Sequence, residues 1–303
     1  MKWVSERLKG PSAQLIPVWG SRNLFSNGTS VQPVFLKALG SEEILSAAES
    51  VVFLGEVDEK AFFAIGLSRE NGTLADELRR LGEFNDLKAM APLLEHDAGA
   101  LLSHARAMVH WHRSTRFCGD CGHPTGIADA GHKRVCTNGN CGRQHFPRTD
   151  PAIIVLVARD GSCLLGRQKV WPEGFYSTIA GFVEPGESLE EAVAREVAEE
   201  TSIRINEVFY HSSQPWPFPG SIMLGFTAGA GSTAIALRDQ ELEDARWFTR
   251  DDIESALRHG ELRLPTRISI AYRLIEDWFD SVGGVPLRGL LDSIGKPQGL
   301  GKL

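Results

Sequence analysis

Three glutamates in one short stretch are spaced so that they could hold a metal ion. They lie in a segment whose apolar spacing and Ser188 cap predict a helix over 188–201. In such a helix Glu196, Glu199 and Glu200 fall within one sector of about 100°. Neighbouring carboxylates near a helix C-terminus repel one another and oppose the helix dipole, and a divalent cation such as Mg²⁺ would reverse that cost. Taken alone, the glutamates are also compatible with an ordinary solvated helix face.

Four of the five cysteines form two short pairs. Two residues separate Cys118 from Cys121, four separate Cys136 from Cys141, and fourteen residues lie between the pairs. This spacing is typical of a zinc ribbon, in which four thiolates hold Zn²⁺ in a closed tetrahedral site. We expect one structural zinc ion per chain; disulfides and free thiols are the alternatives, and a cytosolic chain disfavours disulfides. The nearby side chains that could replace one thiolate are His123, His132 and His145.

The glutamates belong to a longer pattern that runs from Gly181 to Ile203. It reads Gly-x5-Glu-x7-Arg-Glu-Val-x-Glu-Glu-x-Ser-Ile, with its arginine at Arg195. This pattern resembles the signature of the Nudix hydrolases at every defining position except Ser202, where the family usually has glycine. Serine can adopt the left-handed helix-end conformation expected there at a cost of about 1 kcal/mol. The resemblance implies an α/β/α sandwich around a mixed sheet and hydrolysis of a nucleoside diphosphate linked to another group.

A second motif follows the pattern 181–203 (the Nudix box) and runs from Ser213 to Ser221. Three prolines alternate there with Trp216 and Phe218, and we call it the Pro-aromatic motif. Proline fixes the backbone, so the rings would be held rigidly, which suits stacking on a flat heterocycle. A proline-rich turn with core aromatics is the alternative. The stretch resembles the SQPWPFPxS motif of the NADH pyrophosphatases, a Nudix family with a four-cysteine zinc ribbon and a degenerate N-terminal domain. The resemblance covers the chain from about residue 97, and residues 1–96 by position alone.

Carried over to this chain, the resemblance implies roles for individual residues. Glu196, Glu199 and Glu200 become ligands of catalytic Mg²⁺ or Mn²⁺, with Glu241 as a further ligand, and Arg195 is placed to orient Glu199. Relatives are homodimers, so a homodimer is implied. The residues that match substrate-contact positions are Phe146 (usually tyrosine in relatives), Ala180, Gln214, Pro215, Trp216, Pro217, Phe218, Pro219, Gly220, Ser221 and Ala271.

The implied reaction is hydrolysis of the pyrophosphate bond of NAD(H) to NMN(H) and AMP. The divalent ions would neutralise charge and activate a water, and Glu199 or Glu200 could accept the proton. An alternative with the same chemistry is removal of the NAD cap from RNA 5′ ends, aided by a small basic patch. An alternative of another class is a zinc-ribbon binding protein with an inactive Nudix fold, which the intact Arg-Glu-x-x-Glu-Glu run disfavours. The side chains of the basic patch are Lys133, Arg134, Arg143 and Arg148.

Composition narrows the class of protein. The 303 residues are 42% apolar and 23% charged, which excludes a disordered tail, a collagen-like chain and a disulfide scaffold. The longest apolar run, 152–158, is far shorter than the roughly 20 residues of a membrane span. No signal-peptide pattern opens the sequence, so a cytoplasmic location without membrane association is expected. The net charge of −7 disfavours tight nonspecific binding of nucleic acid.

The glutamates, cysteines and aromatic side chains described above must be positioned by the fold, which we expect to be of the α/β class. We expect a degenerate N-terminal α/β domain over 1–114 without a catalytic motif, a zinc ribbon over 115–147, a Nudix sandwich with a mixed sheet over 148–285, and a frayed Gly- and Pro-rich tail over 286–303. Strands are expected at 34–39, 50–57, 61–67, 151–158, 162–166, 176–180, 205–211, 222–228 and 245–248, and helices at 73–81, 97–113, 188–201, 250–258 and 267–278.

Overall fold

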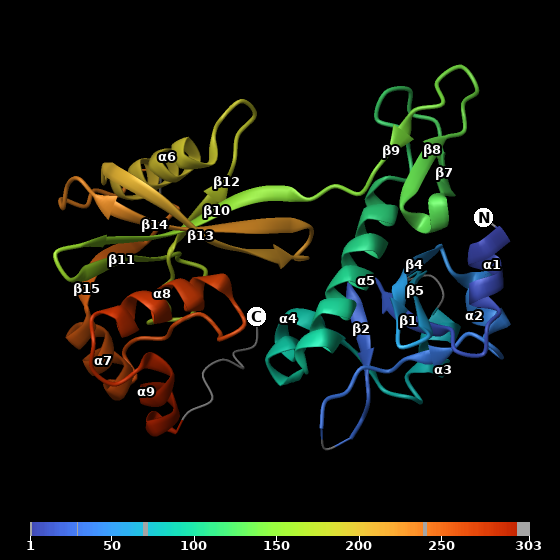
Figure 1. The fold of residues 1–303 in the computed structure, drawn as a ribbon, viewed down its shortest axis with the longest axis horizontal. Helices are drawn as coiled ribbons and strands as arrows, with labels where there is room; N and C mark the ends of the chain where they lie inside the picture. Colours follow the sequence, from blue (N-terminus) through green and yellow to red (C-terminus); the bar gives the residue numbers. More distant parts are fainter. Residues whose placement is uncertain (1, 29, 69–71, 239–240, 296–303) are drawn as a thin grey trace. The chain divides into compact units, whose positions relative to one another are not determined.

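The computed structural model describes residues 2–28, 30–68, 72–238 and 241–295. The chain forms two compact units, of which the first comprises Met1–Thr149 and Trp216–Gly220 and the second Asp150–Pro215 and Ser221–Leu303. Each unit is built around its own sheet (Figure 1). No described helix combines the length and the hydrophobicity that a bilayer span requires.

A six-stranded mixed sheet forms the centre of the second unit (Figure 1). Its order is β13-β14-β10-β11-β15, and β12 also pairs with β10. Strand β10 is parallel to β14 and antiparallel to β11 and β12. The strands are β10 (Asp150–Arg159), β11 (Ser162–Arg167), β12 (Ile179–Phe182), β13 (Ile205–Trp216), β14 (Ser221–Ala230) and β15 (Asp244–Thr249).

Helices cover both faces of this sheet because β10 is apolar on both sides. Ile153, Val155 and Val157 belong to the core that includes α6, whereas Ile154 and Leu156 belong to the core under α7, α8 and α9 (Figure 1). The expected α/β/α sandwich is therefore confirmed. The helices are α6 (Leu189–Thr201), α7 (Arg250–His259), α8 (Ile270–Ser281) and α9 (Leu287–Ile294).

The expectation of a frayed tail is wrong for Leu287–Ile294, which forms α9. Leu287, Leu290 and Leu291 are buried in the core under α7 and α8. Their spacing of three and four residues places them on one helical face. The glycines and prolines around this short amphipathic pattern obscured it.

The first unit has a six-stranded sheet of its own, in the order β4-β5-β1-β2-β6, with β3 also pairing with β1. Helix α5 (His96–Ser114) packs on one face, and residues of α1, α2 and α3 belong to the core on the other. This is the expected α/β domain. Its remaining elements are α1 (Lys2–Leu8), β1 (Gln14–Trp19), β2 (Arg22–Phe25), β3 (Leu36–Lys37), α2 (Glu42–Ala47), β4 (Ser50–Val57), β5 (Lys60–Leu67), α3 (Gly72–Leu78), β6 (Glu83–Asp86), α4 (Leu87–Met90) and η1 (Ala91–Leu93).

Buried polar contacts fix the cysteine-rich segment to α5. Arg134 donates from Nε to Thr125 Oγ1 (2.7 Å) and from Nη1 to His112 Nδ1 (3.0 Å), so His112 carries its proton on Nε2 and donates it to the Gly131 carbonyl (2.7 Å). Burial lowers the pKa of His112 to about 4, which keeps the ring neutral at neutral pH. The elements of the segment are β7 (Thr125–Ala128), η2 (Asp129–Gly131), β8 (Lys133–Cys136) and β9 (Gln144–His145).

Candidate active site

Helix α6 begins and ends where the sequence predicts. The Ser188 side chain accepts a hydrogen bond from the Glu191 amide, and the Glu191 carboxylate accepts one from the Ser188 amide (2.8 Å). At the other end Ser202 is left-handed, with φ 61° and ψ 13°, and its amide donates to the Ala198 carbonyl. The Ser202 hydroxyl donates to the Ala236 carbonyl (2.8 Å). Serine thus reaches the helix-end conformation for which the family usually has glycine.

Arg195 contacts acidic side chains of α6 and of the residues that precede it. It donates from Nε to Glu187 (2.8 Å) and from Nη1 to Glu196 (2.9 Å) and Glu199 (3.1 Å). Its Nη2 also donates to the Phe182 carbonyl (2.8 Å), which ties α6 to β12. The hydrogen bonds to Glu187 are the largest influence holding the pKa of Arg195 above its usual value. The expected contact with Glu199 is present, together with contacts to two further carboxylates.

The predicted metal ligands differ in burial, and two of them, Glu199 and Glu241, act electrostatically on Glu196. The side chains of Glu196 and Glu199 are 12% and 56% exposed, and Glu200 is buried. Burial raises the pKa of Glu196, the Arg195 hydrogen bond opposes this, and the charges of Glu199 and Glu241 add to the rise. Glu187, Glu196 and Glu199 share one guanidinium, and oxygen donors with this excess of negative charge fit a divalent cation.

Gly181 leaves space for the Glu196 carboxylate. It lies on β12, which packs against α6, and a Cβ placed on it would lie 1.9 Å from Cδ of Glu196. The glycine that opens the pattern is therefore required for a close approach.

Gln214 is engaged with the start of α8. Its Nε2 donates to the Ile268 carbonyl (2.6 Å), and its Oε1 accepts from the Ile270 amide (2.8 Å). Ala271 follows in the first turn of α8 and is buried. Gln214 therefore fixes the backbone that carries Ala271. The other substrate-contact candidates in this unit are Ala180 and Pro215, both exposed, and Ser221, which is half-buried.

The first unit holds Phe146 and the segment Trp216–Gly220. Phe146 is 62% exposed. The rings of Trp216 and Phe218 meet edge to face, with centroids 5.1 Å apart, and Phe218 also packs against the core beside α5. Phe218 thus packs partly in the hydrophobic core, as expected from the alternative in which the motif is a proline-rich turn with core aromatics. Pro217 is buried, Pro219 is exposed and Gly220 is half-buried.

The four cysteines of the predicted ribbon converge on one point. Their sulfur atoms all lie within 4.8 Å of one another, with Cys118 and Cys141 3.9 Å apart and Cys121 and Cys136 3.4 Å apart. A tetrahedral zinc site with bonds of about 2.3 Å requires sulfur–sulfur distances of roughly 3.8 Å. All cysteines of the described chain are free thiols, so the cluster fits zinc.

Three family models match consecutive parts of the chain. A model described as the NADH pyrophosphatase-like rudimentary NUDIX domain matches residues 12–111, the NADH pyrophosphatase zinc ribbon domain matches 113–146, and the NUDIX domain matches 147–266. The chain belongs to the Nudix family. Two of the three matches are those of NADH pyrophosphatases in particular, as the Pro-aromatic motif indicates.

Several curated proteins are similar to this Nudix chain. The NAD-capped RNA hydrolase NUDT12 of Macaca fascicularis is 40% identical over 234 residues, which is 72% of this chain and 50% of that protein. The NAD-capped RNA hydrolase NudC of Mycobacterium bovis is 44% identical over 204 residues, 64% of each chain. Nudix hydrolase 19, chloroplastic, of Arabidopsis thaliana is 38% identical over 244 residues, 74% of this chain and 54% of that protein. The Nudix chain thus matches between half and two thirds of the length of these relatives.

Phe182 is a further candidate for substrate contact that the sequence does not single out. Phe182 follows Gly181 directly, is 61% exposed, and its carbonyl accepts the hydrogen bond from Arg195. An exposed aromatic ring is suited to contact a base. The signal was an aromatic residue inside the box next to the glycine.

Three of the four side chains of the expected basic patch are engaged with other groups of the chain. Arg134 is buried and engaged with Thr125 and His112. Lys133 forms an ion pair with Asp129 (2.8 Å), and Arg143 forms one with Asp120. Neutralised pairs attract a polyanion weakly, so these side chains give the ribbon little electrostatic affinity for RNA.

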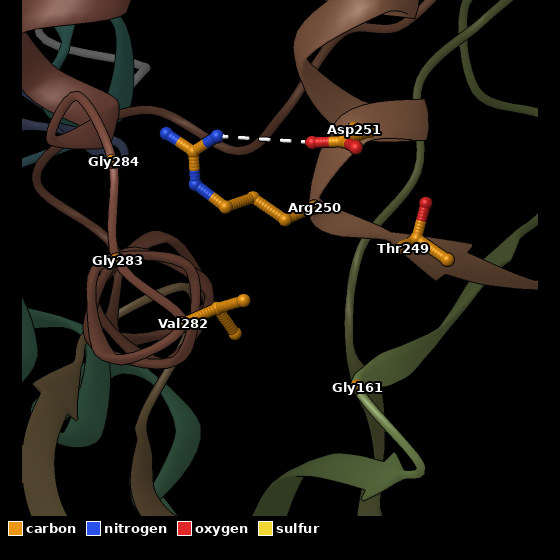
Figure 2. A pocket seen from close by; sticks show the side chains of 7 residues that line it. All are labelled: Gly161, Thr249, Arg250, Asp251, Val282, Gly283 and Gly284. Carbon is orange, nitrogen blue, oxygen red and sulfur yellow. Dashed lines mark ion pairs between the residues drawn. The ribbon is translucent and has the colours of Figure 1, made fainter.

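The second unit also has a pocket of about 390 Å³, which is lined by none of the predicted site residues (Figure 2). Its cation, Arg250, pairs with Glu254 (3.1 Å) and donates to the Val285 carbonyl (2.8 Å), and its guanidinium lies 4.3 Å from the centroid of the Phe279 ring. Arg250 thus joins α7 to the segment after α8. The residues that line the pocket are Gly161, Thr249, Arg250, Asp251, Val282, Gly283 and Gly284.

Proposed function

We propose that this Nudix protein hydrolyses the pyrophosphate bond of NAD(H) to NMN(H) and AMP, with Mg²⁺ or Mn²⁺ as the catalytic cation. The observation that carries the proposal is the carboxylate cluster around Arg195 on α6. It belongs to a chain whose matched domains include two of the NADH pyrophosphatase type.

Glu196, Glu199, Glu200 and Glu241 would hold the divalent ions. A bound divalent cation supplies positive charge at the pyrophosphate and makes water a stronger nucleophile. Arg195 fixes the carboxylates of Glu196 and Glu199, so the acidic groups are oriented before substrate arrives. Glu199 or Glu200 would accept the proton of the attacking water.

Substrate recognition is assigned to the predicted contact residues. Trp216 is half-buried and offers a ring, while Phe218 supports that ring from the core side. Phe146 and Ala180 are exposed, as a direct contact requires. A homodimer, a cytoplasmic location, a single structural zinc per chain and domain limits at residues 114, 147 and 285 remain predictions.

A second candidate substrate is NAD-capped RNA. Two similar proteins, from Macaca fascicularis and Mycobacterium bovis, are named NAD-capped RNA hydrolases. The same phosphorus–oxygen bond would be broken, so the acidic cluster serves either substrate. The paired cations of the ribbon give no support to strong RNA binding at that surface.

The test is hydrolysis of the pyrophosphate bond in the presence of Mg²⁺ or Mn²⁺: AMP and NMN(H) are measured for NADH and NAD⁺, NMN and 5′-monophosphate RNA for NAD-capped RNA, and AMP and ribose 5-phosphate for ADP-ribose. NADH, NAD⁺, NAD-capped RNA and ADP-ribose are compared at equal concentration, with the Glu196→Gln variant as the inactive control. We expect metal-dependent products from NAD(H) with the unmodified chain and almost none with the variant. Binding of NADH without products under any metal would instead favour the inactive binding protein.

A further inference from the structure

Arg106 is a buried cation in the first unit that contacts the Pro-aromatic segment. It lies on α5 and is only 7% exposed. Its Nε donates to the Pro217 carbonyl (2.8 Å), and its Nη1 donates to the Ser21 carbonyl and lies 3.9 Å from a carboxylate oxygen of Asp86. One guanidinium therefore joins the turn after β1, the end of β6 and the segment 216–220.

The same guanidinium also contacts a ring of the segment. Its central carbon lies 4.8 Å from the centroid of Phe218, and Phe218 meets Trp216 edge to face. On α4, Lys88 Nζ lies 5.8 Å from the centroid of Trp216. A guanidinium over an aromatic face restricts that ring, and the effect is strongest when the pair is shielded from water. Arg106 therefore constrains both the backbone and the ring of the segment.

The prolines control the shape of the segment 216–220, whereas Arg106 controls its location. Prolines fix the internal backbone angles of residues 215–219, so they set the shape of the segment. They do not determine where the segment lies. The hydrogen bond to the Pro217 carbonyl and the contact with Phe218 supply that second constraint, and both come from one side chain.

We propose that Arg106 is a positioning residue that places Trp216 for recognition of a substrate base. The role in recognition rests on the proposed hydrolysis of NAD(H), whereas the placement of Trp216 does not. It gives the N-terminal domain, for which no catalytic motif is expected, a function in the reaction: its helix α5 carries the group that locates the segment Trp216–Gly220.

The placement is tested by the indole N–H signal of Trp216 in ¹⁵N-labelled protein, assigned with Trp216→Phe. Arg106→Met removes all donors, and Arg106→Lys keeps a charge without the planar fork. The matched control is Arg134→Met, which removes another buried arginine of the same unit that bonds Thr125 and His112. We expect the signal to shift or broaden in both Arg106 variants, less in the lysine variant, and to stay in place in Arg134→Met. An unshifted signal in Arg106→Met overturns the proposal.

The role in recognition is tested by kinetics on the same variants. Loss of a well-placed stacking group is expected to raise KM for NADH about tenfold and to change kcat less than about threefold. A double-mutant cycle with Phe218→Ala separates this role from general destabilisation. If Arg106 acts through Phe218, the KM of the double variant is no higher than that of the poorer single variant. The effects of Arg134→Met and Phe218→Ala on KM are expected to multiply. Multiplying effects for Arg106 and Phe218 would overturn the role in recognition. An unmodified chain that does not hydrolyse NADH overturns the proposed function, while the Trp216 signal still decides the placement.

Discussion

The Arg195 guanidinium meets three carboxylates, of Glu187, Glu196 and Glu199, and shows how one residue can orient an acidic site. Each contact restricts a flexible side chain that repulsion would otherwise separate. Glu200 follows Glu199 on the same helix and is buried.

Replacing Glu200 by Gln is expected to lower kcat for NADH by about 10²-fold or more, since it removes one anionic ligand and preserves volume. The measurement is kcat at saturating Mg²⁺, with circular dichroism to confirm the fold. Glu190→Gln is the control, because Glu190 is exposed in the first turn of the same helix. An undiminished kcat for Glu200→Gln would remove its role as a metal ligand.

Gly181→Ala is expected to reduce activity more than stability. The added Cβ would displace the Glu196 carboxylate, which is the end of a flexible side chain, so the melting temperature should change little while kcat falls about tenfold or more. The control is Gly99→Ala in α5, where a Cβ meets open space and helix propensity favours alanine by about 1 kcal/mol. Equal kcat values for Gly181→Ala and the unmodified chain would show that the Glu196 position is not critical.

The residues of the site differ in how far the sequence reveals them. The glutamates of α6 and the cysteine pairs are close in sequence, so their spacing alone brings them together. Arg106 and Pro217 are 111 positions apart, and their contact depends on the fold of the first unit. The same applies to Arg134, which looks like a surface cation in sequence but is buried by its bonds to Thr125.

At the scale of the element, α6 is predictable because its signals agree. Its capping box, apolar face and left-handed end all favour the same limits, and the helix lies at Leu189–Thr201. Strand β1 was missed because Pro17 interrupts its apolar run, and α9 because glycines and prolines flank it. The strand expected at 34–39 is reduced to Leu36–Lys37, and the one at 176–180 begins only at Ile179.

The end of α6 provides a stability test. Ser202→Ala loses the hydrogen bond to Ala236 and keeps the left-handed backbone, so it should lower the free energy of unfolding by about 1 kcal/mol. Ser202→Gly loses the same bond but relieves about 1 kcal/mol of backbone strain, so it should stay close to the unmodified chain. Urea unfolding of the unmodified chain and of the two variants gives the order of their free energies of unfolding. An alanine variant that is at least as stable as the glycine variant would contradict this account.

At the scale of the whole molecule, each unit has separate hydrophobic cores around its own sheet. The cysteine cluster belongs to the first unit and is joined to α5 through Arg134 and His112. The acidic cluster of α6 belongs to the second unit. Loss of zinc should therefore weaken one unit without unfolding the other.

This independence can be measured by hydrogen exchange after removal of zinc. A structural zinc site contributes its binding energy to folding, so chelation in Mg²⁺-free buffer should accelerate amide exchange over 113–146 and at the C-terminal end of α5, where His112 meets Arg134. Amides of α6 should keep their protection, because its core is separate from the ribbon. Cys118→Ser should reproduce the pattern and lower the zinc content from about one ion per chain, while Cys163→Ser, which alters a buried thiol of the second unit, should leave zinc in place. Equal loss of protection in α6 and the ribbon would mean that the two units unfold as one, and a chain purified without zinc would contradict the metal assignment.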